Sequence, residues 1–276
     1  MATDYGAGEA YQGFARVYDE MMASRDYRVW ADYVADLAGD YGVRPPGNLL
    51  DLACGTGSFL KEMAQRGWMV TGLDQSVAML GIAREKLWEA RIPVRFYEGD
   101  IRDFRLDEQF PLITCLCDSL IYLVEPEGLR KALVRIKNHL APGGLFIADL
   151  NTEYKYREIL GTGSFAETFP NSAYIWENIY DPETRMNRME IDFFVREKGD
   201  LFRHIPEVHL QRYYAPEEIV AFVHDAGFTE VDLWEAFTKN SLNAMSGEEL
   251  LRMEESRAVP EDGNPYAIGR MFLVAR

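Results

Sequence analysis

The feature that most constrains the fold is an apolar segment that runs directly into a glycine-rich loop. Residues 49–59 read LLDLACGTGSF, so a short apolar strand is followed by Gly55 and Gly57 and then by residues suited to a helix. Glycines at such a turn allow positive φ and let the backbone approach a ligand closely. The free N–H groups of the following helix face the same place. The segment therefore predicts a ligand site at the end of a first parallel strand.

Apolar strands alternate with helices over most of the chain, which is typical of a doubly wound α/β sheet. Strands are predicted at 48–53, 69–73, 94–98, 112–117 and 145–150, and the APGG sequence at 141–144 is predicted as a turn. Helices are predicted from the glycines to Gln65 and at 76–90, 126–140 and 215–227. Two amphipathic helices, 11–23 and 27–39, precede the sheet, and strands 228–237 and 270–276, with a short acidic helix at 246–257, end it.

Between residues 151 and 213 this rhythm gives way to alternating apolar and polar side chains. Met189, Ile191, Phe193 and Val195 are apolar and their neighbours are mostly polar, as in a half-buried antiparallel strand. Similar strands are predicted at 173–180 and 201–213. We therefore predict three parts: an N-terminal helical lid at 1–46, a sheet core at 47–150 and 214–276, and an inserted antiparallel β cap at 151–213.

Acidic residues stand at the ends of the first three strands. Asp51 precedes the glycines, Asp74 ends the second strand and Asp100 follows the third. An acid before the loop suits an ammonium group, a strand-end carboxylate can accept both hydroxyls of a ribose, and Asp100 with Ile101 can hold an adenine. Together they fit a nucleoside with an amino-acid tail. A dinucleotide fits less well, because Leu60 stands where G-x-G-x-x-G needs its third glycine.

At these residues the sequence resembles the class I S-adenosylmethionine-dependent methyltransferases. LLDLACGTG is similar to their first motif, with Ala53 where many members have glycine. The resemblance is to bacterial small-molecule members, both uncharacterised Gram-positive proteins and amino-sugar N-methyltransferases. It continues through GFARVYDEMM, YRVWADY, LDQSVAML, EGDIRDF, CDSLIYL and the cap sequence MEIDFFVREKGDLFRHIPEVHLQRYYAPEEI. It implies a Rossmann-like fold, with S-adenosyl-L-methionine as the cofactor.

The resemblance also implies a role for each matching residue. Asp51, Ala53 and the backbone of Gly55 and Gly57 would hold the methionine moiety, and Asp74 the ribose. The remaining cofactor residues would be Gln75 and Met79 beside the adenosine, Asp100 and Ile101 at the adenine, Cys117 and Ser119 under the sulfonium, and Tyr18 and Trp30 closing over it. For Tyr18 and Trp30 the alternative is core packing on a helical stripe.

Methyl transfer needs a general base only if the nucleophile arrives protonated. The candidates are His209, Tyr122 and Asp118, the last two directly after the fourth strand. His204 and His209 should lie on opposite faces of their strand, and the polar neighbours of His209 favour it as the site residue. Asp118 could instead cap a helix. The aromatic set Tyr174, Trp176 and Tyr180 could line a pocket or form the core of the cap.

Composition limits the partners. A formal charge of −16 without clustered lysine and arginine argues against nucleic acid as a partner. The apolar run 111–124 is too short to span a bilayer, and no metal-ligand spacing is present. Three cysteines fit a reduced compartment, so we expect a cytoplasmic protein, which could form a homodimer, with a small-molecule methyl acceptor. The alternatives are a catalytically silent cofactor-binding or regulatory module and, less well supported, a nicotinamide oxidoreductase.

Overall fold

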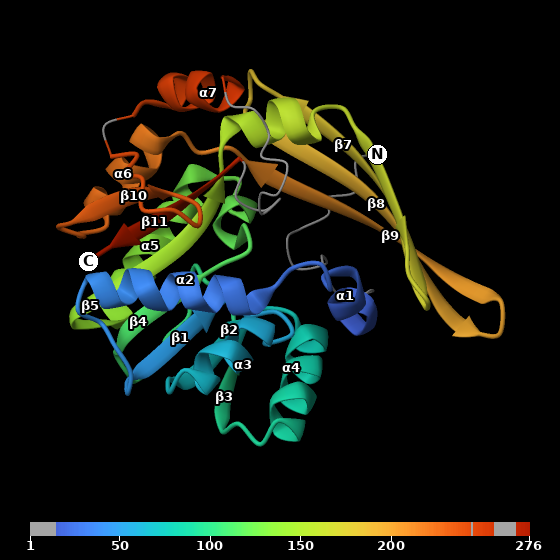
Figure 1. Cartoon of the computed structure of the whole chain (residues 1–276), viewed down its shortest axis with the longest axis horizontal. Helices are drawn as coiled ribbons and strands as arrows, with labels where there is room; N and C mark the ends of the chain where they lie inside the picture. The colour runs from blue at the N-terminus through green and yellow to red at the C-terminus, as the bar shows by residue number, and fades with distance from the viewer. Residues whose placement is uncertain (1–14, 244, 257–268) are drawn as a thin grey trace.

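The computed structural model of the chain describes residues 15–243, 245–256 and 269–276 (Figure 1). The predicted helix at 11–23 therefore lies partly outside the described residues. The elements in chain order are α1 (Ala15–Met21), α2 (Tyr27–Asp40), β1 (Asn48–Leu52), α3 (Ser58–Gln65), β2 (Met69–Asp74), α4 (Val77–Glu89), β3 (Val94–Glu98), β4 (Phe110–Cys115), the 3-10 helix η1 (Ser119–Tyr122), α5 (Pro126–His139), β5 (Leu140–Asn151), the π-helix η2 (Lys155–Leu160), β6 (Ser164–Thr168), β7 (Ser172–Asp181), β8 (Met186–Lys198), β9 (Leu201–Arg212), α6 (Pro216–Asp225), β10 (Val231–Glu235), α7 (Gly247–Glu255) and β11 (Arg270–Ala275).

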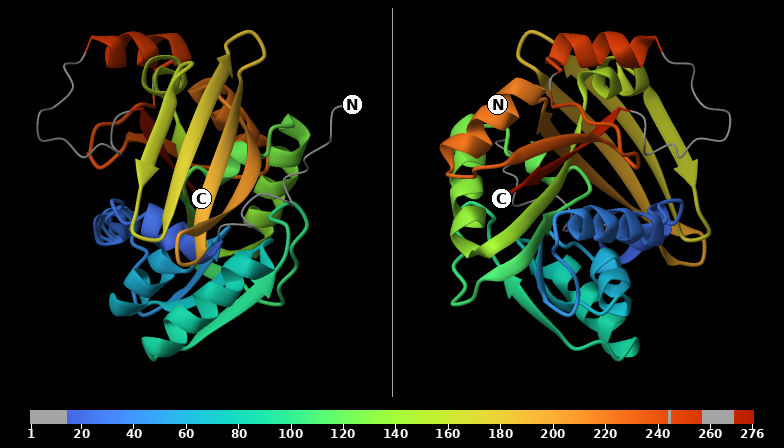
Figure 2. Two further views of the ribbon diagram at one scale, coloured as in Figure 1. Left: turned by 90° about the vertical axis from the view of Figure 1, so that its right-hand side faces the viewer. Right: turned by 60° about the vertical axis from the view of Figure 1, so that its left-hand side comes forward.

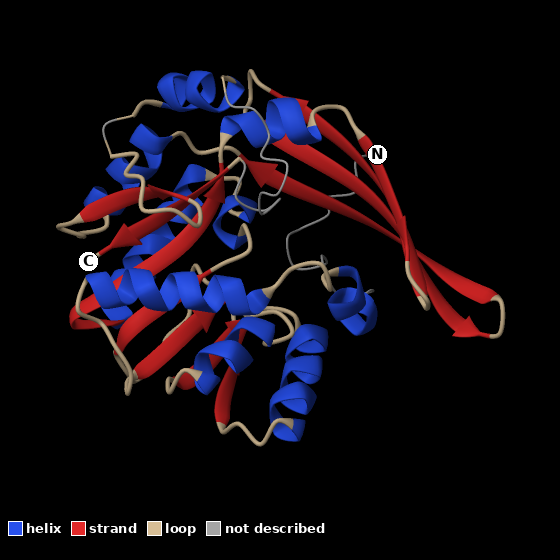
Figure 3. Cartoon of the chain, in the orientation of Figure 1, coloured by secondary structure: helices blue, strands red, loops and turns tan. Residues whose placement is uncertain are grey.

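A seven-stranded sheet in the order β10-β11-β5-β4-β1-β2-β3 forms the centre of the molecule. Helices cover both of its faces (Figure 3). One hydrophobic cluster joins the sheet to α2, α3 and α4, and a second joins it to α5 and α6. The order reverses between β1 and β4, so the loops after these strands diverge and leave a crevice at the carboxyl edge. The doubly wound α/β architecture is thus confirmed.

A separate four-stranded antiparallel sheet, β6-β7-β8-β9, forms a second layer (Figure 2). Its strands alternate as the sequence predicts: Met189 and Phe193 of β8 are buried, and Arg188 between β7 and β9 is exposed. The inner face packs on α1, where Val17 contacts the cluster around Phe193. The hairpin between β8 and β9 extends furthest from the central sheet (Figure 1).

Several predicted boundaries and one strand direction differ from the structure. β11 runs antiparallel to both β5 and β10. The alternation of strands and helices along the chain had predicted a wholly parallel sheet. β4 ends at Cys115 rather than residue 117, because Cys117 has φ +60° and cannot continue a strand. The predicted APGG turn is the first part of β5, which begins at Leu140 opposite Phe110.

Strand β6 was missed by the sequence analysis. Its exposed residues show no apolar alternation, and its position is fixed by pairing with β7. Within the part of the chain that the structure describes, no helix is both long and apolar enough to cross a membrane.

Candidate functional site

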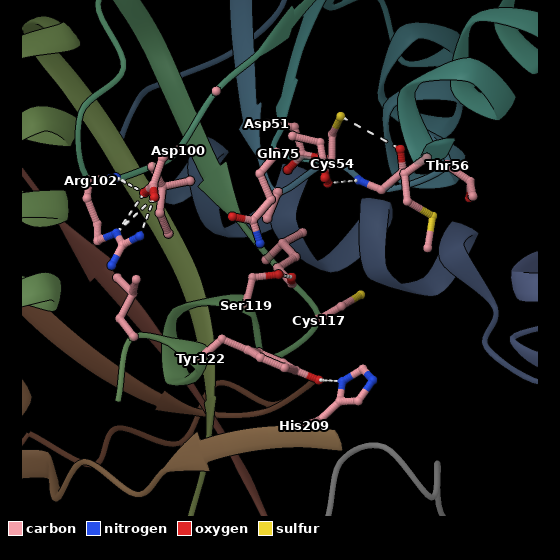
Figure 4. A pocket seen from close by; sticks show the side chains of 18 of the residues that line it. Asp51, Cys54, Thr56, Gln75, Asp100, Arg102, Cys117, Ser119, Tyr122 and His209 are labelled. Carbon is pink, nitrogen blue, oxygen red and sulfur yellow. Dashed lines mark hydrogen bonds and ion pairs between the residues drawn. The ribbon is translucent and has the colours of Figure 1, made fainter. Parts of the chain in front are cut away.

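A cavity of about 350 Å³ lies at the carboxyl ends of β1 to β4. Its walls come from the loops after these strands, from α1 and η1, and from residues 208–210 of the cap strand β9. Figure 4 shows acidic side chains on one side of this cavity and Tyr122 with His209 on the other. The cavity thus lies between the central sheet and the cap.

The glycine loop forms the floor of the cavity. Ala53, Gly55 and Gly57 all have positive φ, which turns the chain sharply from β1 into α3. A Cβ on Gly55 would meet no atom within 4 Å, so its front is open to a ligand. Gly57 differs from the prediction: it does not line the cavity, and a Cβ there would come within 3.1 Å of the Leu87 side chain. Its lack of a side chain lets the glycine loop lie close to Ala83 and Leu87 of α4.

Asp51 lies buried at the end of β1 and lines the cavity. The hydroxyl of Thr114 donates a hydrogen bond of 2.6 Å to its Oδ1. Burial raises the pKa of Asp51 to about 7, although the hydrogen bond from Thr114 works in the opposite direction. A cationic group in the cavity would stabilise the charged form. The residue is therefore suited to receive an ammonium group, as its place in the sequence indicated.

Asp74 connects the end of β2 to the glycine loop. One carboxylate oxygen accepts a hydrogen bond from the Gly55 N–H at 2.8 Å, and the other accepts one from the Ser76 N–H at 2.8 Å. Burial raises the pKa of Asp74, and these backbone donors partly offset the effect. Each oxygen has a further lone pair that can accept a hydroxyl. Gln75 and Met79 line the cavity beside it.

Asp100 and Ile101 line the cavity after β3, as predicted. Sequence analysis missed Arg102, whose guanidinium forms a bidentate ion pair with Asp100 at 2.5–2.9 Å (Figure 4). Burial alone would raise the pKa of Asp100, but the hydrogen bonds from Arg102 outweigh it and hold the pKa below its ordinary value. This carboxylate is therefore ionised, oriented by Arg102, and available only as an acceptor.

The loop after β4 separates residues that the sequence analysis had grouped together. Cys117 and Ser119 line the cavity, but Asp118 between them does not. Asp118 turns away from the cavity. Its carboxylate accepts hydrogen bonds from both terminal guanidinium nitrogens of the buried Arg270, which also pairs with Asp149. Although burial opposes ionisation, the charges of Arg270 and Lys155 lower the pKa of Asp118 to about 2. The proposed role of Asp118 as a base is therefore wrong: it is an ionised structural partner that holds the loop.

Tyr122 and His209 come together across the cavity. The Tyr122 hydroxyl and His209 Nδ1 are 2.9 Å apart, and His209 Nε2 lies 3.0 Å from a carboxylate oxygen of Glu207. His209 is 2% exposed. His204, on the opposite face of β9, is exposed and pairs with Asp192 at the surface. The alternation argument thus chose the histidine that the structure places in the cavity.

Of the two predicted covering aromatics, only Tyr18 lines the cavity. Trp30 is instead buried in the core, where its ring packs on Phe237 and Phe272 and lies under the Arg270 guanidinium. The prediction that Trp30 closes over the cofactor is therefore wrong, and the alternative of core packing holds for this residue. The cap aromatics also form core: Trp176 packs on Phe165, and Tyr180 stacks on Tyr156.

Other residues also line the cavity, from the loops after the strands and from α2, α3, α5 and β9. They are Tyr27, Cys54, Thr56, Ser58, Phe59, Gly99, Arg102, Leu116, Leu123, Val124, Glu125, Gly128, Val208 and Leu210. Tyr27 could have been inferred, since it shares the amphipathic helix α2 with the residues that pack on the sheet.

Residues 49–144, which contain the glycine loop and the first strand ends, match the family described as Methyltransferase domain. A dTDP-3-amino-3,4,6-trideoxy-alpha-D-glucopyranose N,N-dimethyltransferase of Streptomyces venezuelae is 31% identical over 79% of this chain and 89% of its own. The chain belongs to the S-adenosylmethionine-dependent methyltransferases. The predicted methyltransferase YqeM of Bacillus subtilis (strain 168) is 29% identical over 90% of this chain and 98% of its own.

The fold of the methyltransferase agrees with this membership. The crystal structure of an S-adenosylmethionine-dependent methyltransferase from Clostridium acetobutylicum ATCC 824 superimposes with a TM-score of 0.76 and 26% identity. The similarity covers 96% of this chain and 98% of the other, so it includes the cap as well as the central sheet. S-adenosylmethionine is therefore the cofactor. The alternative of a nicotinamide oxidoreductase is wrong.

The residues of the cavity fit this cofactor. Among the described residues no cation pairs with the buried carboxyl of Asp51, the front of Gly55 is open, and Asp74 retains acceptor capacity. S-adenosylmethionine carries one group that matches each: an ammonium, a carboxylate tail that needs backbone room, and a ribose. When bound, it supplies a methyl group on a positively charged sulfur.

Proposed function

We propose that this methyltransferase transfers the methyl group to an amine or hydroxyl of a small molecule that enters between η1 and the cap strand β9. Asp51 would bind the ammonium of the cofactor and Asp74 its ribose hydroxyls. Ile101 would pack on the adenine and Asp100 would accept from its amine. Cys117 and Ser119 would lie under the sulfur, and Tyr18 would cover it.

One observation carries this proposal. A single cavity of about 350 Å³ has acids from three successive strand ends on one side and the Tyr122–His209 pair on the other. A cofactor bound along the strand ends would point its methyl group away from the sheet and toward that pair. Such an in-line displacement mainly requires that the reacting groups are aligned and that water is excluded. The cap strand β9 would exclude water from the cavity.

The relatives favour an amine as the acceptor. The Streptomyces venezuelae relative is named for N,N-dimethylation of an amino sugar carried on dTDP. The cavity wall around Tyr122 also suits a cation, because Tyr18, Tyr27 and Glu125 line it as well. We therefore propose an amino-bearing sugar or a similarly sized amine.

Two further expectations belong with this function. The formal charge of −16 disfavours a nucleic-acid acceptor, because its phosphates would be repelled. Cys54, Cys115 and Cys117 are free thiols, which agrees with a reducing cytoplasm. A homodimer stays a prediction.

Calorimetric titration with S-adenosylmethionine, S-adenosylhomocysteine and NAD tests cofactor binding. We expect heat with the first two only, and a folded protein that binds neither would refute the proposal. Transfer of a labelled methyl group is then measured with dTDP-3-amino-3,4,6-trideoxyglucose and with its 3-hydroxy counterpart. Tight cofactor binding without transfer to any amine or hydroxyl in a wider panel would instead favour the silent cofactor-binding module.

A further inference from the structure

Glu207 belongs to no part of the cofactor site, yet its side chain is only 7% exposed. It lies on the inner face of β9, two residues before His209, opposite Ile191 of β8. A carboxylate enclosed in this way normally has a strong hydrogen-bond or charge partner. Here the partner is Nε2 of His209 at 3.0 Å.

This contact fixes which nitrogen of His209 carries the proton. If the Glu207 carboxylate is ionised it can only accept, so the proton of a neutral imidazole then lies on Nε2. Nδ1 is then bare and accepts the hydroxyl proton of Tyr122 across 2.9 Å. The three groups form one directed chain from Tyr122 through His209 to Glu207, and both Tyr122 and His209 line the cavity (Figure 4).

We propose that Glu207 is a positioning residue that makes Tyr122 and His209 a proton relay, and that the relay selects a protonated amine as the methyl acceptor. This inference rests on the proposed methyl transfer. An imidazole can take a proton from an ammonium group, whose usual pKa is near 10, at moderate cost. It cannot take one usefully from an alcohol, which is a far weaker acid.

The proton and electron movements balance. The acceptor ammonium gives a proton to the phenol oxygen of Tyr122 while the phenol hydroxyl proton passes to Nδ1 of His209. The resulting imidazolium is stabilised by the negative charge of Glu207. The freed nitrogen lone pair then bonds to the methyl carbon, the carbon–sulfur bond breaks, and its electron pair stays on the sulfur.

The described residues place several further groups around this relay. Met189 of β8 stands directly opposite His209, and the Tyr18 and Tyr156 phenols interact electrostatically with Tyr122 from α1 and η2. The charged residues Asp192 and His204 lie on the other face of the cap sheet. Glu207 is thus the anion that the described residues place in contact with the imidazole.

Nitrogen-15 NMR of the imidazole in the free enzyme tests the positioning without any acceptor. We expect the Nε2–H tautomer in the wild type. Glu207→Gln should keep that tautomer, because its amide oxygen can still accept from the Nε2–H, whereas Glu207→Leu should lose it. His204→Gln provides the matched control and should change nothing at His209. An Nδ1–H tautomer in the wild type, or an Nε2–H tautomer that persists in Glu207→Leu, would overturn the inference even if S-adenosylmethionine still binds.

The pH–rate profile tests the relay itself, with dTDP-3-amino-3,4,6-trideoxyglucose as acceptor. The acidic limb of the kcat/KM profile should differ between Glu207→Gln and the wild type, because the imidazole loses a carboxylate partner at 3.0 Å. Tyr122→Phe should lower kcat by about 100-fold or more. A Glu207→Gln variant that loses rate equally at all pH values would show that Glu207 only supports the fold. Absence of cofactor binding in the wild type would count against the proposed function instead.

Discussion

Replacing Asp51 with asparagine should weaken cofactor binding and remove its dependence on pH. The pKa of Asp51 is about 7 in the free protein because the carboxyl is buried. An ammonium group bound beside it would make the ionised form dominant, so each binding event should release a proton from this residue. Release should be nearly one proton at pH 5.5 and about half a proton at pH 7, and affinity should rise about 15-fold between these values.

The binding measurements are limited to pH 7 and below because the α-amino group of the ligand itself loses a proton near pH 8. Proton release is obtained by calorimetric titration with S-adenosylhomocysteine in two buffers of different ionisation enthalpy. Glu254→Gln is the matched control: the pKa of Glu254 is also raised by burial to about 7, but this residue lies on α7 outside the cavity. The reasoning is refuted if wild-type binding releases no proton, or if Asp51→Asn releases as many.

The same substitution should stabilise the free protein at high pH. The folded state holds the Asp51 proton up to about pH 7, whereas an unfolded chain loses it near 3.8. Stability from this group is therefore complete below pH 3.8 and is lost as pH rises to 7. Asparagine can still accept the Thr114 hydrogen bond but carries no charge. Its stability advantage in urea unfolding should grow by at most roughly 3 kcal/mol between pH 5 and pH 8.

Three further substitutions test other parts of the site. Asp74→Ala should weaken cofactor binding by about 1–3 kcal/mol through the loss of a buried acceptor, measured by calorimetry; unchanged affinity would remove the ribose assignment. Gly57→Ala should lower the free energy of unfolding by about 1–2 kcal/mol, since φ is +73° and the new Cβ would lie 3.1 Å from Leu87; equal urea midpoints would contradict this. Asp118→Ala should cost about 3–5 kcal/mol of stability, because Arg270 would lose a buried partner; a loss below 1 kcal/mol would argue against the ion pair.

The cofactor side of the cavity could be predicted from the sequence because its residues sit at strand ends. Periodicity locates where each parallel strand stops, and parallel strands bring these ends to one edge. Asp51, Asp74 and Asp100 follow from that rule without any tertiary information. His209 follows from strand alternation in the same way, since its neighbours decide which face of β9 is inside.

The errors arise where a residue has two plausible environments and the deciding partner is distant in sequence. Trp30 lies on an apolar helical stripe, which describes a core residue and a cavity residue equally well. Asp118 stands beside true lining residues, but Arg270, which turns it away, is 152 positions further along the chain. Tyr122 is separated from His209 by 87 positions, so their hydrogen bond could not be inferred from either local pattern.

Several locally unfavourable features are concentrated at the carboxyl edge of the sheet. Asp51 is a buried acid that no cation of the described residues pairs with, and Cys117 and Asp118 both hold positive φ in the loop under the expected sulfur. Such conformations cost free energy and persist only where the surroundings impose them. Here the surroundings are the ion pairs of Arg270 with Asp118 and Asp149, which join that loop to β5 and β11. The buried Arg270 of the last strand, β11, therefore holds the loop after β4 in place.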